Sequence, residues 1–266
     1  MASSTYSEIL ERIGSALQAA KQIFAGYTPG KIAAEYKSGH DPVTAADREI
    51  DGLLKEHLLR EGEGWLSEES TDDVRRLGRE RVWVVDPLDG TREFVAGIPE
   101  FSVSIALVDE GHPVAGGILN PATGETFLGS VGSGVTYNGA PRGASRHNRL
   151  EGALVLASRS EVARGEWERF HNAPFRIQAM GSVAYKLARV AAGLADVTFT
   201  LTPKHEWDVA AGAALVLSGG GFVESLDGPL AWNQKHPKIS GLIAGSPLLR
   251  HELSEFLRPH MSVVSE

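Results

Sequence analysis

Hydrophobic positions recur along this chain with two different spacings, and each spacing predicts a different element. Between residues 9 and 24 they lie three and four positions apart, as on one face of a helix. This helix is predicted to begin near Thr5, which has capping-box spacing to Glu8. The same periodicity over residues 50–58 predicts a second helix, beginning at about Thr44. Two amphipathic helices are therefore expected before the first strand.

The next stretch of the chain has the patterns of strands. Residues 82–85 are a short, fully apolar run, which is typical of a buried strand. Residues 101–109 alternate strictly, so their odd-numbered positions are predicted to share one face. Apolar stretches over residues 113–137 predict a meander, which continues into a hairpin turn at Asn138-Gly139. Two helices beside a mostly antiparallel sheet make this half an α+β structure.

The second half of the chain alternates between predicted strands and helices. The polar, basic and turn-rich segment 139–152 is predicted to separate the halves, and two domains are expected, over residues 1–145 and 146–266. Strands are predicted at 153–158, 195–200, 221–225 and 241–246, and helices at 160–170, 182–193, 207–220 and the C-terminus. Alternation of this kind predicts a layered α/β arrangement.

The composition is that of a soluble globular protein, with 42% hydrophobic and 23% charged residues among 266. No apolar run approaches the roughly 20 residues needed to cross a bilayer, and the N-terminal stretch lacks a signal-peptide core. The absence of cysteine excludes disulfides, thiolate zinc sites and a cysteine nucleophile. A cytoplasmic protein that does not act at a membrane is therefore expected.

The formal net charge is −8, from 26 basic and 34 acidic residues. Nonspecific binding of a nucleic acid polymer depends on Lys and Arg, so such a partner is not expected. The acidic excess is either a solvated surface or, in part, a set of carboxylate ligands for hard cations. No H-E-x-x-H, G-x-S-x-G or Walker A motif is present, so the zinc-hydrolase, serine-hydrolase and P-loop classes are not predicted.

A pair of acids ends the apolar run at residues 82–85. Asp86 follows the run directly, and a carboxylate there is costly unless it is paired or bound to a cation. The next residue is proline, so the chain is predicted to turn and bring Asp89 back near Asp86, with the Leu88 carbonyl between them. A short helix is predicted from Gly90-Thr91, with its first N–H groups directed at the same place. Oxygen ligands beside a helix N-terminus suit a phosphate bridged to a metal ion.

Each acidic segment also has a structural explanation, which the residues alone leave open. Asp89-Gly90 has the sequence of a common turn, and Glu68 is equally consistent with a surface acid. Asp47 has capping-box spacing to Thr44. Asp208 is predicted in the first turn of a helix, where the dipole favours an acid by about 0.3–1 kcal/mol. The combination of these segments in this order is more specific than any one of them.

Together the segments resemble the inositol monophosphatase superfamily of Mg²⁺-dependent, lithium-sensitive phosphatases. The resemblance spans the whole chain and runs through DPVTAAD, LSEES, WVVDPLDGTREF, NPATGETF, GSVAYK and EWDVAAG. Its specific part is DPLDGT with EE upstream and WD downstream. The resemblance implies an αβαβα sandwich of the inositol monophosphatase/fructose-1,6-bisphosphatase type. The N-terminal domain would carry most metal ligands, and the C-terminal domain would carry Asp208 and the substrate contacts.

The resemblance also implies roles for single residues. The metal ligands would be Glu68, Asp86, the Leu88 carbonyl, Asp89 and Asp208. Thr91 would pair with Asp47 to orient and deprotonate the attacking water, and Glu68 would take part in catalysis beside a third, weaker ion. The N–H groups of Gly90 and Thr91 would hold the phosphate. The cofactor would be two or three Mg²⁺ ions, with Mn²⁺ able to substitute and Li⁺ or Ca²⁺ inhibiting.

The segment DGTREF resembles the bisphosphate nucleotidases of the CysQ type, whereas inositol phosphatases tend toward DGTTNF. The favoured function is a Mg²⁺-dependent 3′(2′),5′-bisphosphate nucleotidase, which converts 3′-phosphoadenosine 5′-phosphate to AMP and phosphate. The alternatives are an inositol-1-monophosphatase, a broad sugar-phosphate phosphatase and a non-catalytic relative that binds phosphometabolites. In each case the partner is a small-molecule phosphate ester. Both homodimers and monomers are familiar in such families.

Substrate contacts are predicted in the second half of the chain. Gly181 and Ser182 would contact the non-reacting part of the substrate. Lys186 would either meet a second phosphate or lie on a solvated helix face, since many nucleotidases place their lysine one position earlier. Lys204, His205 and Glu206 would either line the same pocket or be charges on a loop.

Overall fold

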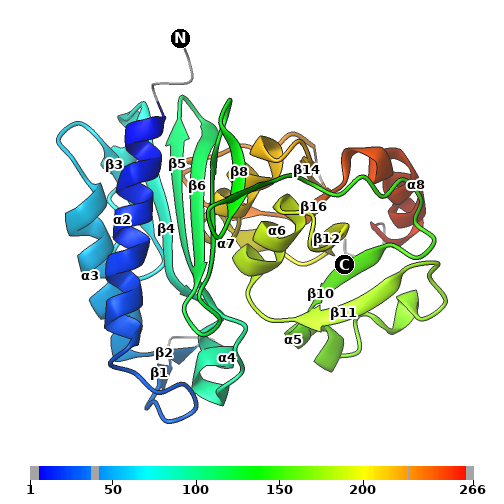
Figure 1. Cartoon of the computed structure of the whole chain (residues 1–266), viewed down its shortest axis with the longest axis horizontal. Coiled ribbons are helices and arrows are strands. Elements are labelled where there is room, and N and C mark those ends of the chain that lie inside the picture. The colour runs from blue at the N-terminus through cyan, green and yellow to red at the C-terminus, as the bar shows by residue number, and fades with distance from the viewer. Residues whose placement is uncertain (1–5, 37–41, 227, 262–266) are drawn as a thin grey trace.

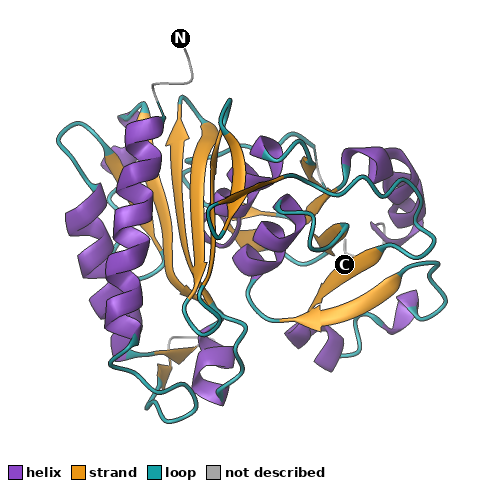
Figure 2. Cartoon of the chain, viewed as in Figure 1, coloured by secondary structure: helices purple, strands orange, loops and turns teal. Residues whose placement is uncertain are grey.

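The computed structural model describes residues 6–36, 42–226 and 228–261. Its elements form five layers, in the order helices, sheet, helices, sheet, helices (Figures 1 and 2). This arrangement is the predicted αβαβα sandwich. Within the described residues, no helix combines the length and the apolar character that crossing a bilayer requires.

The first layer is a pair of helices, α2 (Ser7–Phe24) and α3 (Ala45–Leu58), which pack against the first sheet. Thr44 caps α3 as predicted, because its hydroxyl accepts the N–H of Ala46. The capping box predicted at Thr5 lies outside the described residues. Both predicted helices are present.

The second layer is a seven-stranded sheet in the order β3-β4-β5-β6-β7-β8-β9. Its strands are β3 (Gly64–Ser67), β4 (Arg81–Asp89), β5 (Ser102–Asp109), β6 (His112–Asn120), β7 (Glu125–Ser130), β8 (Gly134–Tyr137) and β9 (Ala140–Arg142). Strands β3 and β4 are parallel, and the other neighbouring pairs are antiparallel. The predicted meander and its turn are confirmed, since Asn138 and Gly139 both have positive φ between the paired Tyr137 and Ala140.

The odd-numbered residues of strand β5 share one face as predicted, and both faces of the strand are buried. Ile105 and Leu107 pack in the core that contains α2 and α3. Ala106 and Val108 belong to the core on the other side of the sheet. The reason is the third layer, which covers the face that an alternating pattern assigns to solvent.

The third layer consists of α6 (Val183–Ala191) and α7 (Glu206–Ser218), which lie between the two sheets (Figure 1). Helix α7 is apolar on nearly all sides because it packs against strands of both sheets. The approach is close, since a Cβ on Gly116 of β6 would lie 2.6 Å from the carbonyl oxygen of Ala211. One core therefore includes residues of both sheets, and the division at residues 145 and 146 stays a prediction.

The fourth layer is a five-stranded sheet in the order β11-β10-β12-β16-β14. Its strands are β10 (Leu154–Ser158), β11 (Arg176–Met180), β12 (Val197–Thr200), β14 (Phe222–Ser225) and β16 (Leu242–Gly245). Strand β10 is parallel to β11 and β12, whereas β16 is antiparallel to β12 and β14. The sequence pattern misses only β11 among these five, because this edge strand is largely exposed.

The fifth layer contains α8 (Arg250–Met261), which is predicted, and shorter elements that cover the outer face of the second sheet. The single helix predicted over residues 160–170 is wrong. The chain forms α5 (Arg159–Ala163) and then η2 (Glu168–Phe170), because Gly165 between them has φ 78° and ends the helix. The remaining elements are β1 (Glu35–Tyr36), β2 (Pro42–Val43), η1 (Val74–Gly78), α4 (Thr91–Ala96), β13 (Lys204–His205), β15 (Lys238–Ile239) and η3 (Pro247–Leu249).

Candidate metal centre and active site

Strand pairing brings the first two acidic residues together. Strands β3 and β4 are parallel, with Ser67 beside Val85, so Glu68 and Asp86 follow at the same end of the sheet. The N–H of Glu68 donates to the carbonyl of Val85 at 3.4 Å. Asp86 is buried and Glu68 is half-buried. The short apolar stretch before Glu68 is therefore a strand that positions a carboxylate.

The turn predicted at Pro87 is wrong, because strand β4 continues to Asp89 and is only irregular between Asp86 and Asp89. Asp86 pairs with Ser104 and Asp89 with Ser102, so β4 has one residue more than β5 in this interval. The N–H of Leu88 donates to Asp86 Oδ1 at 3.0 Å and stabilises this bulge. The bulge keeps both acids at the same end of the buried strand.

Asp208 comes from the other half of the chain. It is the third residue of α7, and its Oδ2 accepts the N–H of His205 at 2.9 Å, as in a capping box. Glu68, Asp86 and Asp208 each present one oxygen, and these three oxygens lie within 4.8 Å of one another. Three of the predicted metal ligands therefore meet at one point.

The charges of these acids are unfavourable together unless a cation offsets them. Burial raises the pKa of Asp86 well above its usual range, and the charges of Glu68, Asp89 and Asp208 raise it further. Burial, with Asp89 and Glu68, does the same to the pKa of Asp208. Carboxylate oxygens are the ligands that hard divalent cations such as Mg²⁺ prefer. The donor set thus fits the predicted cofactor.

Asp89 lies beside this point and binds the turn before α6. Its Oδ2 accepts the hydroxyl of Ser182 at 2.7 Å and the N–H of Ala184 at 2.6 Å. Burial raises the pKa of Asp89, and these two hydrogen bonds offset part of the rise. Asp89 lies at the same end of β4 as Asp86, and its charge raises the pKa of both Asp86 and Asp208. Metal ligation by Asp89 and by the Leu88 carbonyl stays a prediction.

The predicted pair of Asp47 and Thr91 is formed. Asp47 Oδ2 accepts the N–H and the hydroxyl of Thr44, at 2.8 and 2.6 Å, while Oδ1 accepts the hydroxyl of Thr91 at 3.2 Å. The Thr91 hydroxyl also lies 2.9 Å from the carbonyl oxygen of Leu88. The structural and the catalytic explanations of Asp47 are thus compatible, because each uses a different oxygen. Burial raises the pKa of Asp47, which suits a proton acceptor.

The chain turns from β4 into the predicted short helix α4 at Gly90. Gly90 has φ 94°, and a Cβ there would lie 2.9 Å from the carbonyl oxygen of Glu100, so a larger residue does not fit. Helix α4 then begins with Thr91, whose hydroxyl contacts Asp47. Phosphate binding by the N–H groups of Gly90 and Thr91 stays a prediction.

The sequence model of the "Inositol monophosphatase family" matches residues 5–261. The chain belongs to this family. Members of the inositol monophosphatase family hydrolyse phosphoric monoesters and in general depend on Mg²⁺. The acidic centre described above has the ligands that such an ion requires.

Three relatives illustrate the range of the inositol monophosphatase family. The inositol-1-monophosphatase of Mesorhizobium japonicum (strain LMG 29417 / CECT 9101 / MAFF 303099) is 33% identical over 235 residues, which are 85% of this chain and 86% of the relative. The structure of the extragenic suppressor protein suhB from Bartonella henselae has a TM-score of 0.79 at 30% identity and covers 94% of this chain and 98% of its own. CysQ from Bacteroides thetaiotaomicron has a TM-score of 0.76 at 26% identity, with coverages of 91% and 98%.

In this member of the inositol monophosphatase family, Gly181 and Ser182 form a tight turn beside Asp89. The N–H of Gly181 donates to Glu100 Oε2 at 2.7 Å, and Ser182 has a left-handed φ of 54°. Lys186 is buried, and its Nζ donates to the carbonyls of Ser182 and Met180 at 3.0 and 3.3 Å. A solvated helix face at Lys186 is therefore wrong. Burial lowers the pKa of this ammonium group to about 8.

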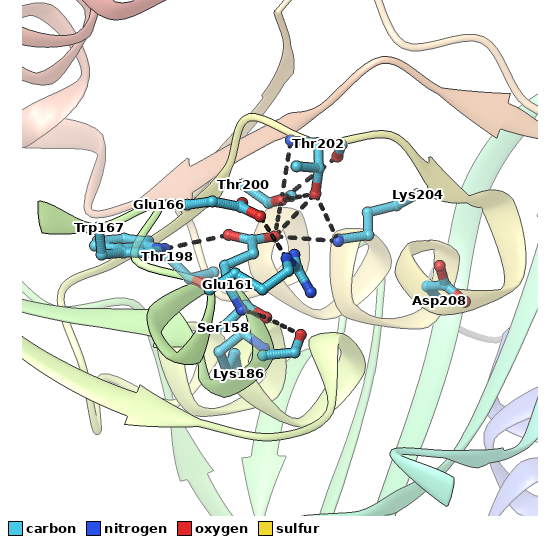
Figure 3. Close-up of polar contacts among 12 residues, drawn as sticks. Ser158, Glu161, Glu166, Trp167, Lys186, Thr198, Thr200, Thr202, Lys204 and Asp208 are labelled. Atoms are coloured by element: carbon cyan, nitrogen blue, oxygen red, sulfur yellow. Dashed lines mark hydrogen bonds and ion pairs between the residues drawn. The ribbon is translucent and has the colours of Figure 1, made fainter. Parts of the chain in front are cut away.

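Glu161 is a buried acid that the sequence pattern does not single out (Figure 3). Its carboxylate accepts hydrogen bonds from three neutral donors, Trp167, Thr200 and Thr202. It also accepts one from Lys204 Nζ, at 3.2 Å. Figure 3 shows Lys204 between Glu161 and the start of α7, where Asp208 lies. The positive charge of Lys204 offsets part of the rise in the pKa of Asp208.

Glu206 does not present its carboxylate to this centre, contrary to the prediction. The side chain is fully buried, and its two oxygens accept the N–H groups of Asn233 and Gln234 at 2.7 and 2.9 Å. The first residue of α7 is therefore turned inward, against the loop that precedes β15. Glu206 is neither a substrate contact nor an exposed loop charge.

Proposed function

We propose that this chain is a magnesium-dependent phosphomonoesterase in which residues of both halves prepare a water molecule and a phosphate ester for reaction. The convergence of Glu68, Asp86 and Asp208 on one point carries this proposal. Glu68 follows β3, Asp86 lies in β4 and Asp208 lies in α7. A chance cluster of acids on one surface loop therefore does not explain their meeting. Glu68, Asp86 and Asp208, with Asp89 and the Leu88 carbonyl, would hold the ions.

Asp47 and Thr91 would take up the proton that the attacking water loses. Asp47 Oδ1 accepts the Thr91 hydroxyl, so the Thr91 oxygen has lone pairs left to accept a hydrogen bond from water. The water oxygen forms the new bond to phosphorus while its proton moves through Thr91 to Asp47. The bond from phosphorus to the alcohol breaks, and the departing oxygen takes a proton from solvent. When bound, Mg²⁺ supplies the positive charge that phosphoryl transfer requires.

For the substrate, we propose 3′-phosphoadenosine 5′-phosphate, hydrolysed at its 3′-phosphate. The ammonium group of Lys204, which Glu161 holds near Asp208, supports a substrate with a second phosphate. Lys186 and Lys204 both border a cavity of about 10 Å³, which has room for about one water and not for a phosphate, and Lys186 is buried. Lys204 is partly exposed and is oriented by Glu161, so it is the better contact for the second phosphate.

Inositol 1-phosphate is the second candidate substrate. It is favoured by the similarity to the inositol-1-monophosphatase of Mesorhizobium japonicum, over most of both chains. A non-catalytic relative that binds phosphometabolites is a third reading. It is disfavoured because the acidic centre and the pair of Asp47 and Thr91 are both formed.

Phosphate release from a panel of esters, assayed with Mg²⁺ and with or without Li⁺, tests these proposals. Adenosine 3′-phosphate is the matched control, because it differs from 3′-phosphoadenosine 5′-phosphate only by the second phosphate. We expect the bisphosphate to give the highest kcat/KM and Lys204→Met to reduce this advantage. An equal or higher kcat/KM for inositol 1-phosphate would refute the nucleotidase assignment alone. Release from none of the esters would leave the non-catalytic reading.

Three broader expectations accompany this function. We propose that the chain acts in the cytoplasm, that residues 1–145 and 146–266 are its two domains, and that it forms a homodimer. Light scattering coupled to size-exclusion chromatography measures the mass in solution. A mass near the 28.5 kDa of one chain would refute the homodimer.

A further inference from the structure

A buried clamp joins the segment that follows Glu68 to the helix that carries Asp208. We define the 233–234 clamp as Arg76 and Glu206 together with the two loop residues that they bind, Asn233 and Gln234. Arg76 lies on η1, eight residues after Glu68, and Glu206 is the first residue of α7. We propose that this clamp is a positioning device that sets the distance between Glu68 and Asp208 at the metal centre.

Arg76 binds Asn233 and Gln234 of the loop through its guanidinium group. Its side chain has no exposed surface, so each of its N–H groups needs a partner inside the protein. The guanidinium donates to Asn233 Oδ1 and, at 2.8 Å, to the carbonyl of Gln234. Asn233 Nδ2 in turn donates to the carbonyl of Arg76 at 3.2 Å. Asp72 accepts two further hydrogen bonds from the guanidinium, at 2.7 and 2.9 Å.

Glu206 binds the backbone of the same two loop residues through its carboxylate. Its carboxylate accepts the N–H groups of Asn233 and Gln234, and its own N–H donates to the carbonyl of Pro237 at 3.0 Å. The loop is also paired with the approach to α7, because β15 and β13 form a short antiparallel ladder. The start of α7, and with it Asp208, is therefore fixed to the loop by side-chain and backbone bonds.

The other end of the clamp is fixed to the strand that leads to Glu68. Gly64 of β3 packs against η1 so closely that a Cβ there would lie 3.0 Å from Cβ of Arg76. The chain from β3 through Glu68 to η1 therefore returns on itself, and the contact between Gly64 and Arg76 joins its two ends. Glu68 and Asp208 belong to different layers of the fold, and the clamp connects the segments that carry them.

The clamp does not touch the phosphate site, so its residues act through the ligands. Removal of groups that orient metal ligands typically weakens metal binding by about 10–100-fold. A clamp that served only general stability would lower the unfolding midpoint and leave the affinity of the folded protein for the ion unchanged. The affinity for Mn²⁺ without substrate therefore distinguishes the two roles.

The test compares Arg76→Lys with Arg75→Lys, the same change at the neighbouring residue of η1. Arg75 is the matched control because its side chain is 85% exposed and pairs with Asp73 outside the clamp. Titration calorimetry with Mn²⁺ measures the Kd, and circular dichroism in EDTA measures folding. We expect Arg76→Lys to raise the Kd about tenfold or more and Arg75→Lys to leave it unchanged.

Asn233→Gly is the second variant, and it decides the question if Arg76→Lys does not fold. Asn233 has φ 57°, which glycine adopts readily, so this change removes the amide contacts with Arg76 and keeps the loop geometry. A raised Kd in the folded protein supports the inference, and an unchanged Kd overturns it. The inference rests on the proposed metal centre. A wild-type protein that binds no Mn²⁺ overturns both, whereas normal binding in the wild type and in the variants overturns the clamp alone.

Discussion

Replacement of Asp86 by asparagine should stabilise the metal-free protein and abolish its stabilisation by Mg²⁺. Asparagine has nearly the same shape as aspartate, and its Oδ1 can still accept the N–H of Leu88. The substitution therefore removes one charge and leaves the bulge of β4 in place. Two opposite effects from one variant distinguish a metal centre from an ordinary group of acids.

The size of the first effect follows from the distances. The oxygens of Glu68, Asp86 and Asp208 lie within 4.8 Å of one another. Two unit charges at that separation repel by about 3.5 kcal/mol at an effective dielectric constant of about 20. A raised pKa favours the neutral acid and so relieves part of this repulsion in the wild type. We therefore expect a gain of about 1–3 kcal/mol in the free energy of unfolding. Each kcal/mol raises the midpoint of thermal unfolding by about 2–4 °C in a chain of this size.

The gain has a defined dependence on pH. The pKa of Asp86 is higher in the folded than in the unfolded chain, so the folded wild-type protein binds more protons between the two values. The stability of the metal-free wild type therefore falls as the pH rises from the ordinary value of 3.8 through the folded-state pKa. Asparagine does not titrate. The advantage of Asp86→Asn is thus smallest near pH 3.8 and largest above the folded-state pKa.

Unfolding followed by circular dichroism, in EDTA and in Mg²⁺, measures both effects. Mg²⁺ at 100 times its Kd should stabilise the wild type by about 2.7 kcal/mol, and the variant should lack this increment. Glu61→Gln, at an exposed position, is the control and should change neither quantity. A variant less stable than the wild type in EDTA would refute the argument from repulsion. A variant that Mg²⁺ still stabilises fully would refute the role of Asp86 as a ligand.

Three other substitutions test separate parts of the structure. Asp89→Asn should abolish phosphate release with an unchanged circular dichroism spectrum, because it weakens a predicted ligand at constant volume; near wild-type activity would exclude that role. Thr91→Ala should lower kcat more than it raises KM in steady-state assays, because orientation of the water matters chiefly in the transition state; a change in KM alone would contradict this. Glu63→Gln should cost about 1–3 kcal/mol in urea unfolding at pH 7, because Glu63 accepts hydrogen bonds from Arg12 and Trp83. Burial raises the pKa of Glu63, but the hydrogen bonds from Arg12 and Trp83 lower it more, so the pKa in the folded protein lies below 4.5. The loss of stability should therefore shrink as the pH falls below 4.5. A loss that does not depend on pH would count against the ion pair.

The elements of the fold could be predicted where burial follows a local pattern. The apolar run before Asp86 and the periodic stripes of α2 and α3 gave correct assignments, because one face or one whole segment faces a core. Strand β11 could not be predicted, since an exposed edge strand needs no apolar pattern. The helix over residues 160–170 failed at Gly165, because the positive φ of one residue outweighs the periodicity around it.

Features of the candidate site that depend on neighbouring residues could be predicted, whereas those that depend on residues distant in the sequence could not. The cap at Asp47 follows from residues a few positions apart and is formed, whereas the turn predicted at Pro87 is a bulge within β4. The burial of Glu161, Arg76 and Glu206 could not be predicted, because charged residues are mostly exposed and a single sequence does not mark the exceptions. Only the packed structure shows the partners of these charges, which include Thr200 and Lys204 for Glu161 and Asn233 for Arg76 and Glu206.

Asp47 and Asp208 show why local patterns alone could not decide between structure and chemistry. Each is the third residue of a helix and accepts the N–H of the residue that caps it, Thr44 or His205. The same carboxylates contact Thr91 in one case and the acidic point in the other. A capping bond forms whenever its helix forms, so the acid is already oriented before any ligand binds, and less conformational freedom is lost at the reaction. The cap is therefore part of how the site is built. What distinguishes a catalytic acid from an ordinary cap is the element on its other side, which is α4 for Asp47 and β4 for Asp208.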